Sequence, residues 1–154
     1  MKKKKTKSIT VRTMQQEDIL SVAELEKECF SVPWSADAFR DSGRKEMYTF
    51  FVAVFEDIIT GYAGIYYTCG EGNITNVAVG KQWRTKGVAT MLLEHIFQNA
   101  ARRRCDKIFL EVRISNLKAV SLYKKMGFEV LGTRKNFYEK PVEDALILCK
   151  NLPL

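Results

Sequence analysis

The sequence predicts an α/β domain of the α+β type, with a mixed sheet of about seven strands flanked by helices. The chain has 154 residues, the size of one ordinary domain. Its apolar residues (46%) and charged residues (28%) stand in proportions typical of globular proteins. The apolar patterns follow the order β-α-α-β-β-β-α-β-α-β-β. Strand–helix–strand units in the second half indicate parallel pairing, whereas the three consecutive strands of the first half indicate a meander.

The first half of the chain predicts a strand, two helices and three further strands. Residues 8–14 alternate apolar and polar side chains, as a strand does. The next segment, 15–30, has apolar residues at helical spacing: Ile19, Val22, Ala23 and Cys29. Pro33 ends that helix, and Ser35 can cap a short second one. The three strands of the predicted antiparallel meander follow at 49–57, 60–70 and 72–80.

The second half alternates helices and strands. A strongly amphipathic helix is predicted over 87–104, and its buried stripe is Val88, Met91, Leu92, Ile96 and Ala100. A strand at 107–113 and a helix at 117–126 come next. The last two strands are expected at 127–138 and 143–152.

The net charge of +7 is concentrated at the N-terminus. Five lysines within the first seven residues leave the rest of the chain near +2. Such a run predicts a disordered basic tail over residues 1–7, followed by a single folded domain at 8–154. The alternative is a weak electrostatic contact between this tail and RNA or another anionic surface.

Composition also excludes several classes of protein. No apolar stretch approaches the roughly 18 residues that span a bilayer, and no apolar segment follows the first lysines, so we expect a cytoplasmic protein without a membrane partner. The four cysteines form no C-x-x-C pair and His95 is the only histidine, so neither a metal site nor a disulfide is expected. The scarcity of histidine also argues against a Ser-His-Asp or Cys-His mechanism.

The loop "QWRTKGVAT", residues 82–90, is a candidate phosphate-binding site. It lies between a predicted strand and the start of a predicted helix, where unpaired backbone N–H groups and a partial positive charge favour anions. Arg84 and Lys86 add cationic donors, and Gly87 and Ala89 leave room for a pyrophosphate. The alternative is an ordinary strand-to-helix turn with solvated basic residues.

The segment "LEVRISNLKAVSLYKKMGF", residues 110–128, contains the second candidate site. Glu111 lies within an apolar strand, on the same face as Phe109 and Arg113. A carboxylate in that position either pairs structurally, for example with Arg113, or faces a cleft as a general base. Tyr123 lies on the apolar stripe of the next helix, where a tyrosine belongs either to the core or to a site.

Together these segments resemble the GNAT acetyltransferase superfamily. Its acetyl-CoA motif is an apolar strand followed by R/Q-x-x-G-x-G/A, which reads here as Val77-Ala78-Val79 and then Arg84-Thr85-Lys86-Gly87-Val88-Ala89. Residues 110–129 are similar to the strand, asparagine and tyrosine helix that follow in that superfamily, at a matching separation. The resemblance implies the GNAT fold over residues 8–152, with its strands splayed to admit acetyl-CoA.

A closer resemblance is to the RimI family, the ribosomal-protein alanine N-acetyltransferases. It is carried by "FSVPWSADAF" (30–39), "LEVRISN" (110–116) and "RKNFYEKPVEDALIL" (134–148). It implies that Glu111 is the proton acceptor and Tyr123 the proton donor. It also implies that Val77–Val79, residues 84–89 and Asn116 contact acetyl-CoA, and that Trp34 and Tyr138 flank the peptide N-terminus, where ordinary packing is the alternative.

The implied activity is acetyl transfer from acetyl-CoA to the N-terminal alanine of a small-subunit ribosomal protein, without a metal. One alternative is an acetyltransferase for other protein N-termini or for small amines, since one fold serves many acceptors. Another is a non-catalytic module that binds acyl-CoA or RNA. The presence of both Glu111 and Tyr123 argues against such a module.

Overall fold

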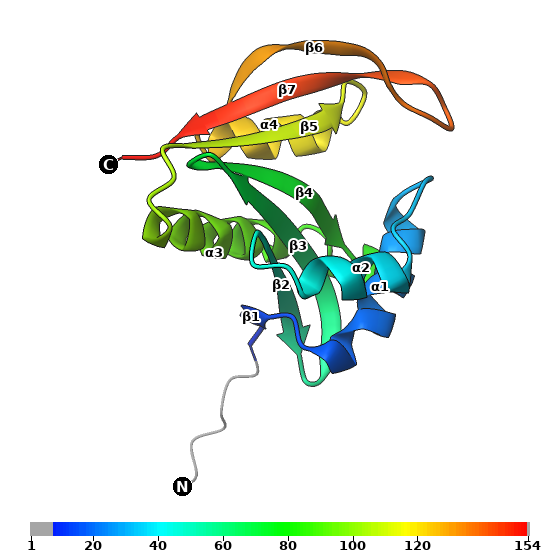
Figure 1. Cartoon of the computed structure of the whole chain (residues 1–154). Coiled ribbons are helices and arrows are strands. Elements are labelled where there is room, and N and C mark those ends of the chain that lie inside the picture. Colours follow the sequence, from blue (N-terminus) through cyan, green and yellow to red (C-terminus); the bar gives the residue numbers. More distant parts are fainter. Residues whose placement is uncertain (1–7, 154) are drawn as a thin grey trace, which may run out of the picture.

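The computed structural model describes residues 8–153 and contains one seven-stranded sheet in the order β1-β2-β3-β4-β5-β7-β6 (Figure 1). The strands are β1 (Thr10–Thr13), β2 (Tyr48–Phe55), β3 (Ile58–Thr68), β4 (Glu71–Val79), β5 (Lys107–Arg113), β6 (Glu129–Tyr138) and β7 (Glu143–Asn151). The helices are α1 (Ile19–Cys29), α2 (Ala36–Gly43), α3 (Val88–Arg102) and α4 (Leu117–Lys125), with short 3₁₀ turns at Gln16–Asp18 and Lys81–Trp83. The predicted element order and the mixed sheet are confirmed.

Only one pair of neighbouring strands is parallel, namely β4 and β5, which α3 connects. The other strand–helix–strand unit, β5-α4-β6, does not give a hydrogen-bonded parallel pair, because β7 lies between β5 and β6 and is antiparallel to both. The tight connection from β6 to β7 favours this hairpin over direct pairing of β5 with β6.

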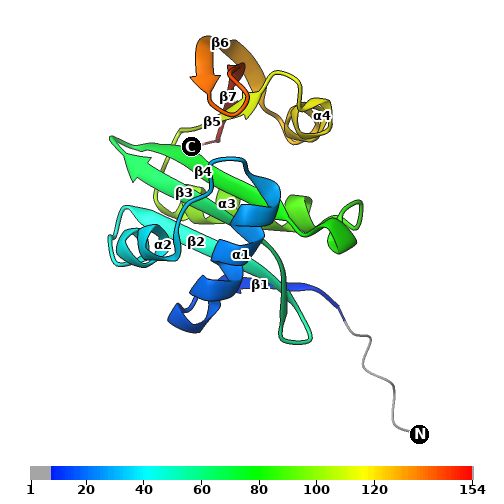
Figure 2. The same cartoon turned by 90° about the vertical axis from the view of Figure 1, so that its right-hand side faces the viewer.

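Helices cover both faces of the first four strands (Figures 1 and 2). On one face α1 and α2 bury Val22, Phe39 and Tyr62 in one apolar cluster. On the other face α3 buries Leu92 and Ile96 in a second cluster, which extends to α4. Ser35 caps α2 as predicted, since its Oγ accepts a hydrogen bond from the Ala38 N–H (3.1 Å).

The sheet opens between β4 and β5. These strands pair at only three positions, from Glu71↔Lys107 to Asn73↔Phe109, and then diverge. Beyond Asn73, no strand among residues 8–153 pairs with the edge of β4 that would face β5. The predicted splaying of the strands is therefore present and creates a gap in the middle of the sheet.

The predicted basic tail over residues 1–7 lies outside the described residues. Within 8–153, no helix is long and apolar enough to cross a membrane. In the same range, no three His, Cys, Asp or Glu side chains are grouped to hold a metal ion. The four cysteines are free thiols; Cys105 and Cys149 are buried, whereas Cys69 is exposed.

Candidate active site

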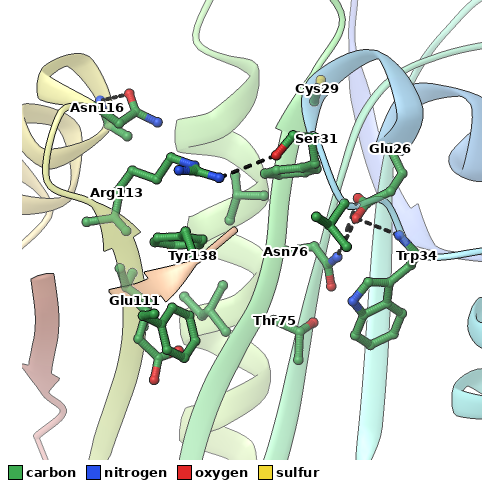
Figure 3. Close-up of a pocket in the computed structure, with 18 of the residues that line it drawn as sticks. Glu26, Cys29, Ser31, Trp34, Thr75, Asn76, Glu111, Arg113, Asn116 and Tyr138 are labelled. Carbon is green, nitrogen blue, oxygen red and sulfur yellow. Dashed lines mark hydrogen bonds between the residues drawn. The ribbon is translucent and has the colours of Figure 1, made fainter. Parts of the chain in front are cut away.

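A cavity of about 480 Å³ occupies the gap between β4 and β5 (Figure 3). Its walls come from α1 and the loop after it, β4, β5, α4 with its N-cap, and the end of β6. Six of the side chains singled out from the sequence line this cavity, namely Trp34, Val77, Glu111, Asn116, Tyr123 and Tyr138. Residues up to about a hundred positions apart in the chain thus meet at one place.

Glu111 faces the cavity from β5, on the predicted face, because its apolar neighbours Leu110 and Val112 turn to the core. Its ion-pair partner is Arg134 on β6, at 3.5 Å between Oε1 and Nη1, and not Arg113. This carboxylate is therefore paired and also faces the cleft, and its role as a general base stays a prediction.

Arg113 instead connects the two loops beside the cavity. Its guanidinium donates hydrogen bonds to the carbonyl oxygens of Glu139 (2.9 Å) and Pro141 (3.0 Å), and to Ser31 Oγ (3.3 Å). It also pairs with Glu143 at 3.1 Å and stacks over the Tyr138 ring at 4.5 Å. Arg113 thus contacts both the loop after α1 and the β6–β7 hairpin, which Ser31 Oγ also joins by donating to the Glu139 carbonyl (3.5 Å).

Tyr123 lines the cavity from α4 and is 8% exposed. Burial raises the pKa of its phenol above the ordinary value, so the group remains protonated and able to donate at neutral pH. Its ring packs edge-on against Phe128, with 5.6 Å between centroids. Asn116 begins α4, and its Oδ1 accepts a hydrogen bond from the Ala119 N–H (3.3 Å).

The predicted phosphate loop lies at the start of α3. Gly87 precedes the helix with φ +80°, a conformation that glycine adopts without strain. Arg84 turns back, donating to the Val79 carbonyl (3.2 Å) and the Cys29 thiol (3.8 Å), while the Lys86 ammonium lies 5.4 Å from the centroid of the Trp83 ring.

Of the cofactor candidates, only Val77 and Asn116 line the cavity; Arg84, Lys86 and Gly87 do not. Ala78 and Val88 are buried in the two apolar clusters, so only their backbone groups are suited to contact a ligand. Val79, Thr85 and Ala89 also lie outside the cavity lining.

Trp34 and Tyr138 lie on opposite sides of the cavity (Figure 3). Trp34 is also packed against Phe39 and Phe50, at 5.3 and 6.1 Å between ring centroids. Burial and, to a smaller extent, the charge of Glu111 raise the pKa of Tyr138 to about 12. Because Trp34 contacts the Phe39 and Phe50 rings and also lines the cavity, its side chain both packs in the apolar cluster and forms part of the cavity wall.

Sequence reasoning missed a second carboxylate in the cavity wall, that of Glu26 on α1. It is 2% exposed and accepts hydrogen bonds from the Trp34 backbone N–H (3.2 Å) and from Asn76 Nδ2 (3.3 Å). Burial raises the pKa of Glu26 from 4.5 to about 7, and these two hydrogen bonds oppose that rise only in part. The available signal was its position three residues after Ala23, on the apolar stripe of α1.

Comparisons with known proteins agree with this geometry. The model of the acetyltransferase (GNAT) family matches residues 19–128. The chain therefore belongs to the GNAT family and is an acetyl-CoA-dependent N-acetyltransferase.

Its similar relatives point to one branch of that family. A Bacillus subtilis protein provisionally named ribosomal protein bS18-alanine N-acetyltransferase is 35% identical, over 94% of this chain and 95% of its own. The Escherichia coli K12 protein named ribosomal protein bS18-alanine N-acetyltransferase is 28% identical, over 91% of this chain and 95% of its own.

Solved structures agree in fold. The Escherichia coli ribosomal-protein-S18-alanine N-acetyltransferase superposes with a TM-score of 0.88 at 26% identity, covering 96% of both chains. A chain of the NatC complex bound to Gag peptide and CoA gives a TM-score of 0.84 at 25% identity, covering 95% of this chain and 99% of that one.

Proposed function

We propose that this protein transfers the acetyl group of acetyl-CoA to the N-terminal alanine amine of a small-subunit ribosomal protein. The observation that carries the proposal is the cavity between β4 and β5, which places Glu111 and Tyr123 on the walls of one cleft. The near full-length similarity to two proteins named for bS18 supports the acceptor. Ribosomal proteins are made in the cytoplasm, where we expect the enzyme to act.

The acceptor amine must lose a proton before it attacks the thioester. An N-terminal α-amine has a pKa near 7.7–8.0, against about 10.4 for a lysine side chain, so it is the easier acceptor to activate. Glu111 is suited to take a proton from the attacking nitrogen through a water. Its ion pair with Arg134 keeps the carboxylate in place.

The carbonyl oxygen of the thioester gains negative charge during the attack and needs donors. The edge of β4 beyond Asn73 has no strand partner, so backbone N–H groups at Val77–Val79 are suited to this role. Tyr123, whose burial keeps it protonated, then supplies a proton to the departing sulfur. Direct transfer needs no nucleophilic side chain on the enzyme.

The start of α3 fits the pyrophosphate of the cosubstrate. The first turn of α3 offers free N–H groups, Gly87 leaves open space where a side chain would stand, and Arg84 and Lys86 bring positive charge. Asn116, at the start of α4, follows Glu111 by five residues and lines the same cavity as Glu111.

The opposite side of the cavity fits an extended peptide end. Trp34 and Tyr138 flank it, and the cavity lining includes the exposed apolar side chains of Phe30, Val32 and Phe137. An apolar rim suits a short uncharged first residue followed by a chain that leaves the cleft.

The test is thiol release from acetyl-CoA by the purified protein. One peptide begins with alanine, and a matched peptide has a blocked α-amine and an internal lysine. We expect release with the first peptide only, and mass spectrometry should locate the acetyl group on the α-nitrogen. Equal release with the blocked peptide, or with a small amine alone, would contradict the proposal and favour another acceptor class.

A further inference from the structure

Three polar side chains with no assigned role meet on the α1 side of the cavity. They are Glu26 of α1 and the consecutive residues Thr75 and Asn76 of β4 (Figure 3). The residues around them are apolar, since Phe39, Phe50 and Tyr62 of the same cluster are at most 3% exposed. A polar group in such surroundings is costly unless hydrogen bonds satisfy it.

A β-bulge explains why two consecutive side chains of β4 share this face. The register between β3 and β4 shifts at Gly64 and Ile65, which pair with Asn76 and Ile74, so that Thr75 has no opposite residue. A Cβ on Gly64 would lie 2.6 Å from Thr75 Oγ1 and 2.6 Å from Phe50, which places Thr75 on the α1 side as well. The bulge therefore turns Thr75 and Asn76 toward Glu26, as bulges beside active sites do.

The hydrogen bonds in this group leave acceptors unused. Asn76 Nδ2 donates to both oxygens of Glu26, at 3.3 and 3.4 Å, and the Trp34 N–H donates to Oε1. Among residues 8–153, no donor reaches Asn76 Oδ1, and Thr75 Oγ1 has no partner there either. Asn76 is 6% exposed, so its amide oxygen is a buried acceptor at the wall of the cavity.

These open acceptors suit a hydrogen-bond donor that arrives with the substrate. Because Asn76 Nδ2 donates to the carboxylate, Oδ1 is the acceptor of this amide that stays open. Glu26 Oε2 accepts only the long Asn76 bond and has capacity for another. A water with two such acceptors and one cationic donor would have the three partners that buried waters typically have.

We propose that Glu26 takes the first proton that the acceptor ammonium loses, through a water that donates to Glu26 and to Asn76 Oδ1. This rests on the proposed transfer to an amine, and it gives Glu26 a step separate from that of Glu111. Asn76 positions the water, and Thr75 Oγ1 lies on the same side of the sheet.

The protons balance with two carboxylates. The α-ammonium gives one proton to Glu26 and becomes a neutral amine. This amine attacks the thioester carbon and gives a second proton to Glu111, while Tyr123 gives its proton to the sulfur as the carbon–sulfur bond breaks. Glu111 then restores the proton of Tyr123, and Glu26 releases its proton to solvent, so the sum is one amide, one thiol and one free proton.

Burial supports this role, because it brings the pKa of Glu26 to about 7, close to that of an α-amine. A carboxyl with an ordinary pKa is a poorer match for this exchange at neutral pH. The ionisable side chains that line the same cavity are Cys29 on α1, Glu111 and Arg113 on β5, Tyr123 on α4, Tyr138 on β6 and Glu139.

The experiment compares the pH dependence of four variants, with an alanine-initiated peptide as acceptor and thiol release as readout. Glu26→Gln keeps the size of the side chain and one acceptor oxygen for the Trp34 N–H, but it cannot take a proton. Glu24→Gln is the matched control, because Glu24 lies on the same helix, is exposed and pairs only with Lys27 among the described residues. Glu111→Gln removes the other carboxylate.

Glu26→Gln should lower kcat/KM for the peptide about 10- to 100-fold near pH 7. At about pH 9.5 the α-amine is already neutral in solution, so the loss should shrink to within about threefold. Glu111→Gln should be impaired at both pH values, and Glu24→Gln at neither. Asn76→Ala, which retains the carboxylate but not Oδ1, should show a smaller loss with the same recovery at high pH.

An equal loss for Glu26→Gln at both pH values, or none at either, would overturn the proposal. A raised KM for acetyl-CoA together with a lowered melting temperature would overturn it too, since that pattern indicates a structural role. These results differ from failure of the proposed function, in which the unmodified protein itself would not acetylate the peptide.

Discussion

Replacing Glu26 with glutamine should stabilise the protein, and only at neutral to alkaline pH. Glu26 has its pKa raised from 4.5 to about 7 by burial. Below pH 4.5 the Glu26 carboxyl carries its proton in both the folded and the unfolded chain. Its contribution to the free energy of unfolding is then fully present. As the pH rises through about 7, the folded chain must hold a charge in apolar surroundings, and that contribution to the free energy of unfolding is lost.

The size of this effect follows from the shift. One pKa unit corresponds to about 1.4 kcal/mol, so a rise from 4.5 to about 7 amounts to about 3 kcal/mol, most of it lost between about pH 5 and pH 8.5. Glutamine has no such titration. The stability of Glu26→Gln relative to the unmodified protein should therefore rise by roughly 2–3 kcal/mol over this range, or roughly 5–10 °C in Tm.

Urea and thermal unfolding of the unmodified protein and of Glu26→Gln, each at about pH 5 and about pH 8.5, would measure this effect. The quantity of interest is how much the stability difference between the two proteins changes with pH, because the other titrating groups contribute equally to both. Glu24→Gln, on the exposed side of the same helix, should show no pH-dependent change relative to the unmodified protein. The reasoning would be refuted if the Glu26→Gln difference were the same at both pH values, or if the variant were less stable at the higher one.

Three further predictions concern the rest of the site. Tyr123→Phe should lower kcat by about 10- to 100-fold while leaving KM for acetyl-CoA unchanged, in steady-state assays of thiol release; an unchanged kcat would remove its role as proton donor. Arg84→Ala combined with Lys86→Ala should raise KM for acetyl-CoA roughly tenfold at low ionic strength and less at high salt, because exposed charges are screened; a salt-independent effect would contradict a phosphate contact. Arg113→Ala should raise KM for the peptide and lower stability by about 2 kcal/mol, since two carbonyl hydrogen bonds and a ring contact are lost; unchanged peptide kinetics would show that its bridge does not shape the entrance.

The fold was largely readable from the sequence because its signals are local. Alternation marks the strands, the stripe through Leu92 and Ile96 marks α3, and Ser35 marks the start of α2. The position of β7 between β5 and β6 was not readable, because pairing of strands depends on contacts between distant segments. The partner of Glu111 was missed for the same reason, since Arg134 reaches it only once that order is set.

In the site, too, features that depend on local sequence were predicted, and contacts between distant segments were not. Local motifs predicted Glu111, Asn116 and Tyr123 as site residues, because they follow one another on a strand and the helix after it, and all three line the cavity. Glu26 and Asn76 are fifty positions apart and meet only through the bulge at Thr75. One clue was present nonetheless, namely a carboxylate on the apolar stripe of α1, and a buried charge at such a place calls for a reason.

The placement of Arg113 also has a mechanical consequence. Arg113 and Glu111 are alternate residues on one face of β5, and β7 is paired with this strand from Lys107 to Arg113. The hairpin beside the cavity and the Glu111 carboxylate are therefore attached to the same strand, two residues apart, so that the entrance and the proposed base share one support.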